Sequence, residues 1–132
     1  AMLSYSNFGS NREFDEPRRV AEAVRILHEK YPEIKVDGEM QADYALNTDM
    51  RDKAFPFNTI AGQEVNTLIF PNLSSANITF KLLLGMGVGR SIGPLQIGLK
   101  KPIYFTGANA TEDEIVDIAT IAALESILST DH

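Results

Sequence analysis

The feature that most constrains the fold of this 132-residue chain is an alternation of short apolar runs with amphipathic segments. The apolar runs that read as strands are Met2–Ser4, Ile34–Val36, Thr67–Phe70, Leu95–Leu99 and Pro102–Phe105. Strands that alternate with helices usually pair in parallel and carry the helices on both faces of the sheet. The pattern therefore predicts an α/β fold, a three-layer sandwich with a mostly parallel sheet.

Two helices are strongly specified. In Arg18–Lys30, the residues Val20, Val24 and Leu27 fall on one apolar stripe. The helix Thr111–Leu128 opens with Thr-Glu-Asp-Glu, a capping box in which threonine and the second glutamate satisfy backbone groups of the first turn. The shorter predicted helices are Gln41–Asn47, Asp49–Phe55 and Ser75–Leu84, the last capped by Ser74 or Ser75.

Composition and charge exclude several classes of function. The net charge of −6 leaves no basic stripe for nucleic acid. The chain has no cysteine, hence no disulfide framework, and no window approaches the ~18 apolar residues of a membrane span. We therefore expect a cytoplasmic domain that binds neither nucleic acid nor membrane. Ala1 before Met2 indicates either a cloning remnant or a fragment of a longer protein. Because the chain starts directly on a predicted strand, we expect a fragment.

Metal and nucleophile chemistry find little support. His28 and His132 are the only histidines, and two histidines without cysteine make a poor metal site. We expect His28 on a solvated helix face and no metal in this chain. No histidine lies near a serine in a triad-like arrangement. The glycine run at 85–89 imitates a phosphate loop, but it follows a helix and so lacks the strand that precedes a dinucleotide fingerprint.

Polar residues cluster after three of the predicted strands, at positions 4–10, 37–43 and 70–77. The carboxyl ends of strands in an open α/β sheet converge on the ligand crevice. Asn, Asp, Ser and Gly also form caps and turns without any ligand. Both interpretations, a cleft and ordinary turns, stay open.

A fourth loop, at 106–110, joins the last predicted strand to the last helix. It contains no Ser, Arg, Lys or His, and the helix that follows carries three acidic residues in its first turn. Those carboxylates already complement the positive end of the helix dipole, so this helix start is a poor anion site. The residues alone favour a structural cap here.

Four segments carry a resemblance: LSYSNFGS, VDGEMQADYALN, LIFPNLSSANITFKLL and IGPLQIGLKKP. Together they resemble the C-terminal part of the phosphate acetyltransferase family (phosphate acetyl/butyryltransferases). The similarity is closest to the acetyltransferase-like domain at the C-terminus of bacterial NADP-dependent malic enzymes. It implies that residues 1–132 are the C-terminal portion of such a domain in a longer multidomain chain, with two α/β lobes and a cleft between them.

The resemblance also implies a changed catalytic loop. True acetyltransferases have a Ser-Arg pair after the GLxKP strand and an Asp in the first turn of the next helix. These positions fall on Gly107, Ala108 and Glu114 in this sequence. Alanine cannot replace the two-pronged guanidinium that holds phosphate or developing charge. Acetyl transfer is therefore not expected, although Glu114 keeps a carboxylate.

The function that the resemblance implies is a non-catalytic regulatory and oligomerisation domain of a malic enzyme, with acetyl-CoA as the effector. It implies no cofactor in this chain; NADP and a divalent metal (Mg or Mn) would belong to another domain of the parent. The expected ligand-facing residues are Ser6, Asn7, Gly9, Asp37, Gln41, Asn72, Asn77, Gly107 and Asn109. The alternatives are an active phosphate acetyl- or butyryltransferase and an oligomerisation module without a ligand.

The helix Ser75–Leu84 predicts self-association. Its apolar residues cover too much of its circumference for a helix that contacts its own core on one side. The resemblance implies assembly through this lobe, so we expect a homodimer or larger oligomer. Full burial of Phe80 and Leu83 inside the chain's own fold would contradict this expectation.

Overall fold

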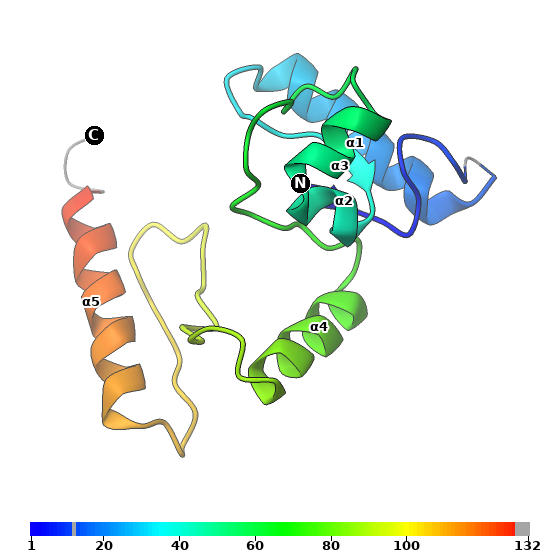
Figure 1. Ribbon diagram of the computed structural model, residues 1–132. Helices are drawn as coiled ribbons and strands as arrows, with labels where there is room; N and C mark the ends of the chain where they lie inside the picture. Colours follow the sequence, from blue (N-terminus) through cyan, green and yellow to red (C-terminus); the bar gives the residue numbers. More distant parts are fainter. Residues whose placement is uncertain (12, 129–132) are drawn as a thin grey trace. The chain divides into compact units, whose positions relative to one another are not determined.

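The computed structural model describes residues 1–11 and 13–128 of the chain (Figure 1). The chain divides into two compact units, Ala1–Lys81 and a second unit from Leu82 onward. In the described residues, no helix is both long and apolar enough to cross a membrane.

The first unit contains parallel strands. β1 (Met2–Leu3) pairs in parallel with β2 (Gly38–Met40). Met2 also forms a parallel bridge with Ile69. A strand residue can face one neighbour on each edge, so β1 lies between β2 and the segment around Ile69. The predicted α/β fold with parallel strands is confirmed.

The strand positions differ from the prediction. The predicted strand Ile34–Val36 is wrong, because the strand lies at β2. The Ile34 amide instead donates to the Tyr31 carbonyl oxygen at 3.0 Å, continuing the turn that ends the preceding helix. The carbonyl oxygen of Val36 is satisfied by side chains, with His28 Nε2 at 2.8 Å and Thr59 Oγ1 at 3.1 Å. Thus His28 is partly buried and holds the loop before β2; the prediction of a solvated histidine is wrong.

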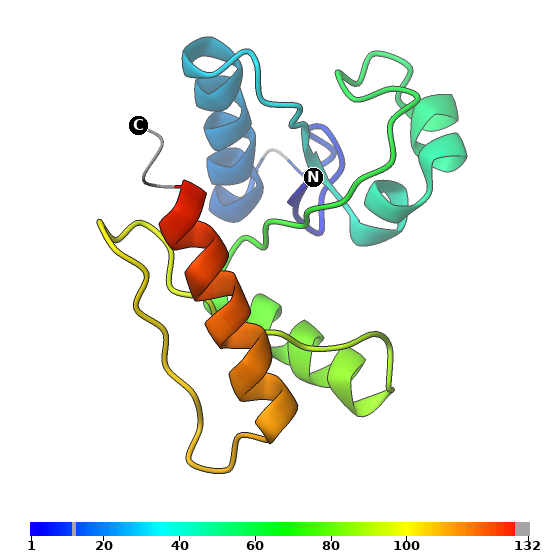
Figure 2. The same cartoon turned by 90° about the vertical axis from the view of Figure 1, so that its left-hand side faces the viewer.

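Helices lie on both sides of these strands, giving three layers in the first unit (Figure 2). On one side, α1 (Asp15–Lys30) buries Pro17, Val20 and Val24. On the other side lie α2 (Ala42–Leu46) and α3 (Thr48–Ala54). The core cluster comprises Leu3, Met40, Ala45 and Ile60.

The predicted helices are confirmed within a few residues. α1 begins three residues before Arg18 and ends at Lys30 as predicted. α4 spans Leu73–Gly85, but its cap is Asn72 rather than Ser74 or Ser75. The side-chain oxygen of Asn72 accepts the Ser75 amide at 2.9 Å. The glycine run follows α4, as the sequence indicates, and Gly87 and Gly89 have positive φ angles.

The second unit is organised around α5 (Glu112–Leu128). The predicted strands Leu95–Leu99 and Pro102–Phe105 are wrong, since the described residues of this unit contain no strand. A strand needs a neighbour that receives its backbone hydrogen bonds, and the described part of this unit supplies none. Instead, two side chains of the stretch before α5 contact that helix: Arg90 pairs with Asp117, and the Tyr104 hydroxyl, in the second predicted strand, donates to Glu125.

Candidate ligand-binding site

The loop that follows β1, residues 4–11, is held by a buried carboxylate. Glu39 lies in β2 and is 2% exposed. Its Oε1 accepts hydrogen bonds from the Ser6 hydroxyl at 2.8 Å and from the Gly9 amide at 2.5 Å. The Ser6 hydroxyl in turn accepts from the Asn11 amide at 3.1 Å. One carboxylate oxygen thereby binds two points of the loop, the Ser6 hydroxyl and the Gly9 amide.

A second set of bonds connects the same loop to the start of α2. The Asn7 amide group donates to Gln41 Oε1 at 2.9 Å, and the Gln41 backbone amide donates to Asn7 Oδ1 at 2.8 Å. The Gln41 side chain also donates to the Tyr5 carbonyl oxygen at 2.7 Å. Four of the predicted ligand-facing residues, Ser6, Asn7, Gly9 and Gln41, are therefore brought together. Their polar groups are already engaged with one another.

The remaining predicted residues of the first unit have different roles. Asp37 is buried, and its carboxylate accepts the Gly38 amide at 2.8 Å and the Thr59 amide at 2.5 Å. Asn72 caps α4 and donates to Glu16 at 3.0 Å. Asn77 is exposed on α4, and its side chain has no hydrogen bond with the described residues. Only Asn77 of this group is free to meet a ligand.

The turn at 106–110 lies in the second unit. Gly107, Ala108 and Asn109 are exposed, and the Ala110 amide donates to the Gly107 carbonyl oxygen at 3.0 Å. The Glu114 carboxylate accepts the Thr111 amide at 2.8 Å, while the Glu114 amide donates to Thr111 Oγ1 at 3.3 Å. This reciprocal pair is the predicted capping box. Glu114 is thus occupied as a cap.

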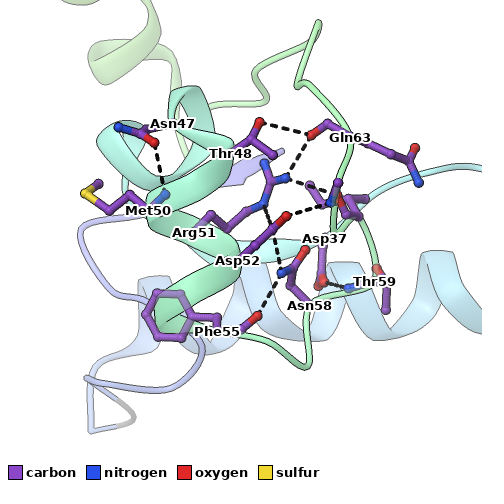
Figure 3. Close-up of polar contacts among 12 residues, drawn as sticks. Asp37, Asn47, Thr48, Met50, Arg51, Asp52, Phe55, Asn58, Thr59 and Gln63 are labelled. Carbon is purple, nitrogen blue, oxygen red and sulfur yellow. Dashed lines mark hydrogen bonds and ion pairs between the residues drawn. The ribbon is translucent and has the colours of Figure 1, made fainter.

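Arg51 is a structural residue that the sequence analysis missed. Its guanidinium is fully buried and donates to the carbonyl oxygens of Ile60 and Gln63 at 3.0 and 2.8 Å (Figure 3). It also donates to Asp52 at 3.1 Å. An arginine in a polar helical stretch gives no sign of burial, because its partners are backbone carbonyls of a loop that follows the helix.

Asp52 completes this polar cluster from the outside. Its carboxylate accepts the Gly62 amide at 2.6 Å and the Asn58 side chain at 3.0 Å. The hydrogen bond from the Gly62 amide is the main cause that lowers the pKa of Asp52, with smaller contributions from Asn58 and Arg51. The cluster holds the loop that follows α3 against the core.

Glu39 was also missed, although it lies within the DGEMQAD block that carries the resemblance. Its burial depends on the loop after β1, which is distant in sequence.

Metal binding finds no support in the described residues, where no three His, Cys, Asp or Glu side chains gather as a metal would need.

Comparison with known proteins shows the family to which the chain belongs. Residues 1–123 match the family described as phosphate acetyl/butaryl transferase. The chain belongs to this family. It is 40% identical to the phosphate acetyltransferase of Treponema pallidum over 127 residues, which is 96% of this chain and 38% of that protein.

Relatives of two kinds are similar to the chain. The NADP-dependent malic enzyme of Rhizobium meliloti is 39% identical over 123 residues, which cover 93% of this chain and 16% of that enzyme. The solved phosphotransacetylase from Streptococcus pyogenes superposes with a TM-score of 0.85 at 32% identity, covering 96% of this chain and 38% of that one. The family thus includes acetyltransferases and malic enzymes, and this chain spans well under half the length of either.

Proposed function

We propose that this chain is a non-catalytic regulatory and oligomerisation domain of an NADP-dependent malic enzyme, and that acetyl-CoA is its effector. The observation that carries the proposal is the turn at 106–110. Where the family resemblance implies a Ser-Arg pair, the chain has Gly107 and Ala108, which have no polar side chain. Loss of one preorganised donor of this kind typically lowers the rate by ~10²–10³.

The geometry of Glu114 supports the same conclusion. Its carboxylate is hydrogen-bonded to Thr111 at the start of α5, so it serves the helix rather than a substrate. In this proposal, oxidative decarboxylation of malate, with NADP and Mg or Mn, belongs to a part of the parent outside this chain. The parent works in the cytoplasm, and acetyl-CoA inhibits it through a coupling free energy between two sites.

The exposed apolar residues of α4 support the oligomerisation part of the proposal. Phe80 is 44% exposed and Leu83 is 42% exposed, and α4 buries none of its residues. Apolar surface of this kind is usually covered by a partner, and we propose that the partner is a second copy of this chain. Phe80→Ser with Leu83→Ser should shift sedimentation of the protein towards the monomer, whereas Ser74→Ala on the same helix should leave it unchanged. An unchanged oligomer in the double variant would contradict this assignment.

The decisive assay uses the full-length gene product. We expect malate oxidation that acetyl-CoA inhibits, and no acetyl-CoA formation from acetyl phosphate and CoA. The second candidate, an active phosphate acetyltransferase, is favoured by the 40% identity to the Treponema pallidum enzyme. A robust rate of acetyl transfer would establish that candidate instead. Absence of both inhibition and binding heat with acetyl-CoA would leave an oligomerisation module without a ligand.

Asn77 within α4 and Asn72, which caps it, give a matched pair of variants. Asn77→Ala removes an exposed amide without a structural bond, so it should weaken inhibition by acetyl-CoA without changing the free energy of unfolding. Asn72→Ala removes the cap of α4 and should lower the free energy of unfolding by about 1 kcal/mol. If Asn77→Ala leaves inhibition unchanged, Asn77 is not a ligand residue.

A further inference from the structure

The helix α4 is short and has little packing to stabilise it. It has 13 residues and buries none of them, and its Ile78 side chain is 67% exposed. Isolated helices shorter than about 12–15 residues are marginal in water, since most helical stability in proteins comes from packing. The fraction of subunits in which α4 is formed therefore depends on the contacts at its ends.

The start of α4 is held by Asn72. Its Oδ1 accepts the Ser75 amide at 2.9 Å, and its backbone carbonyl oxygen accepts the Ser75 hydroxyl at 3.0 Å. A cap of this kind satisfies one of the amides that have no acceptor within the first turn of a helix. The cap forms only while the side-chain amide of Asn72 keeps its oxygen turned towards Ser75.

Glu16 of α1 fixes that orientation from outside the helix. The Asn72 Nδ2 group donates to Glu16 Oε2 at 3.0 Å, so the amide nitrogen points to α1 and the amide oxygen is left for Ser75. The two residues are distant in sequence, but Glu16 and Pro71 border the same cavity of about 180 Å³ in the first unit. A charged acceptor makes a stronger hydrogen bond than a neutral one.

The Glu16 carboxylate also supplies a charge that α4 itself lacks. The first turn of α4 contains no acidic residue, whereas α5 carries Glu112, Asp113 and Glu114 in its own first turn. A negative charge near the N-terminus of a helix stabilises the helix by complementing its dipole. In α5 this charge is local in sequence. In α4 it comes from another helix, through the residue that caps α4.

We propose that Glu16 is a positioning residue for α4 and that it controls self-association through this helix. The apolar residues of α4 form one surface only when the helix is formed. A binding-competent state that is partly populated lowers the apparent affinity in proportion to its population. Glu16 raises that population by orienting the cap and by its charge. The inference rests on the proposed function, in which a second copy of this chain covers α4.

The main test removes the Glu16 carboxylate. In the full-length protein, Glu16→Ala should speed hydrogen exchange of the α4 amides at a concentration where the protein is monomeric, because the helix is formed less often. Each copy loses a contact that shifts the helix equilibrium by about threefold. The dissociation constant of a two-fold dimer should therefore rise by about tenfold in sedimentation, because both copies lose the contact. Asp15→Ala is the control, since it removes the same charge from the same turn of α1, but Asp15 pairs with Arg18.

Two further variants separate the hydrogen bond from the charge. Glu16→Gln keeps an oxygen that can accept the Asn72 amide group but removes the charge, so its effect should be smaller than that of Glu16→Ala. Ser74→Asp places a carboxylate in the first turn of α4 itself. Added to Glu16→Ala, Ser74→Asp should return both the exchange rates and the dissociation constant towards their wild-type values.

The outcomes separate this inference from the proposed function. Faster exchange in α4 and weaker association, both reversed by Ser74→Asp, would support the inference. If Glu16→Ala leaves exchange in α4 at the wild-type rate, the inference is overturned, and Phe80→Ser with Leu83→Ser still tests the association surface by itself. If exchange becomes faster but the dissociation constant is unchanged, Glu16 holds the helix, and association through α4 is contradicted.

Discussion

The two units of this chain bury their apolar residues to very different extents. In the first unit the buried apolar residues are Leu3, Val20, Val24, Val36, Met40, Ala45 and Ile60. In the described part of the second unit only Ile118 is buried, while Ile115, Val116, Leu124 and Ile127 of α5 are at least half exposed. The first unit closes a core within its own 81 residues, and the second does not.

This difference shows that helices can be specified by local sequence, whereas strands need partners that are distant in the sequence. A cap and a run of good helix formers specify α5, although Ile118 is the one residue of this helix that is buried. Strand pairing is a non-local interaction, and among the described residues it forms only in the unit that supplies neighbours for β1. The comparison therefore predicts unequal stability of the two units.

Hydrogen exchange of the 132-residue chain should show this inequality directly. We expect amides of α1 and β1 to exchange only through global unfolding, with opening free energies several kcal/mol above those of α5, roughly 5 kcal/mol. The physical reason is the scarcity of buried apolar contacts around α5. Equal protection of α1 and α5 would mean that the two units share one cooperative core.

Arg51→Ala should produce the largest loss among single substitutions. It removes the donors to the Ile60 and Gln63 carbonyl oxygens and leaves a cavity in the first unit. We expect the free energy of unfolding to fall by about 3 kcal/mol, measured by denaturant titration. The exposed Arg19→Ala should change it by less than about 0.5 kcal/mol. A similar small effect at both positions would show that the buried guanidinium is dispensable.

Gly38→Ala should follow in size. A Cβ atom at Gly38 would lie 2.5 Å from the Met2 carbonyl oxygen, which is backbone in the paired strand β1, and the residue has a φ angle of 147°. We expect a loss of about 2 kcal/mol, within the range for introducing a group into packed space, and faster hydrogen exchange in β1 and β2. Gly62→Ala is the control, since its φ angle is also positive but no atom lies within 4 Å of its added Cβ. Equal losses at Gly38 and Gly62 would assign the effect to the backbone angle alone.

What the sequence predicts correctly is also divided into local and non-local features. Helix bounds were predicted well, because capping and periodicity are local. The sequence predicts a strand at Ile34–Val36, but the strand is β2. Val36 is as apolar as a strand residue, yet its carbonyl oxygen bonds to the His28 and Thr59 side chains. In the site, Ser6, Asn7, Gly9 and Gln41 are predicted to face a ligand, and the structure brings them together through hydrogen bonds with one another and with Glu39. The buried carboxylate that organises them was not predicted, because a glutamate reads as exposed until the loop that covers it is known.

Thr111→Ala should have an effect of about 1 kcal/mol, confined to the second unit. It removes the hydroxyl that accepts the Glu114 amide at the start of α5. We expect faster exchange in the first turns of α5 and no change in α1, measured by hydrogen exchange. Thr106→Ala, in the exposed turn before the helix, should leave both unchanged. Faster exchange in α1 would show that the two units unfold together.

The smallest predicted effect is a pH dependence at Asp52. The Gly62 amide stabilises the charged carboxylate and lowers its pKa from the ordinary value of 3.8. A lowered folded-state pKa contributes stability that is fully present above the unfolded-state value and disappears as pH falls through the folded-state value. Asp52→Asn lacks this contribution, so the difference in unfolding free energy between wild type and variant should shrink as pH is lowered below 3.8. The exposed Glu33 has no hydrogen bond with the described residues, and Glu33→Gln should show no matching change. A difference between wild type and Asp52→Asn that stays constant with pH would mean that only the shape of the side chain matters to the loop after α3.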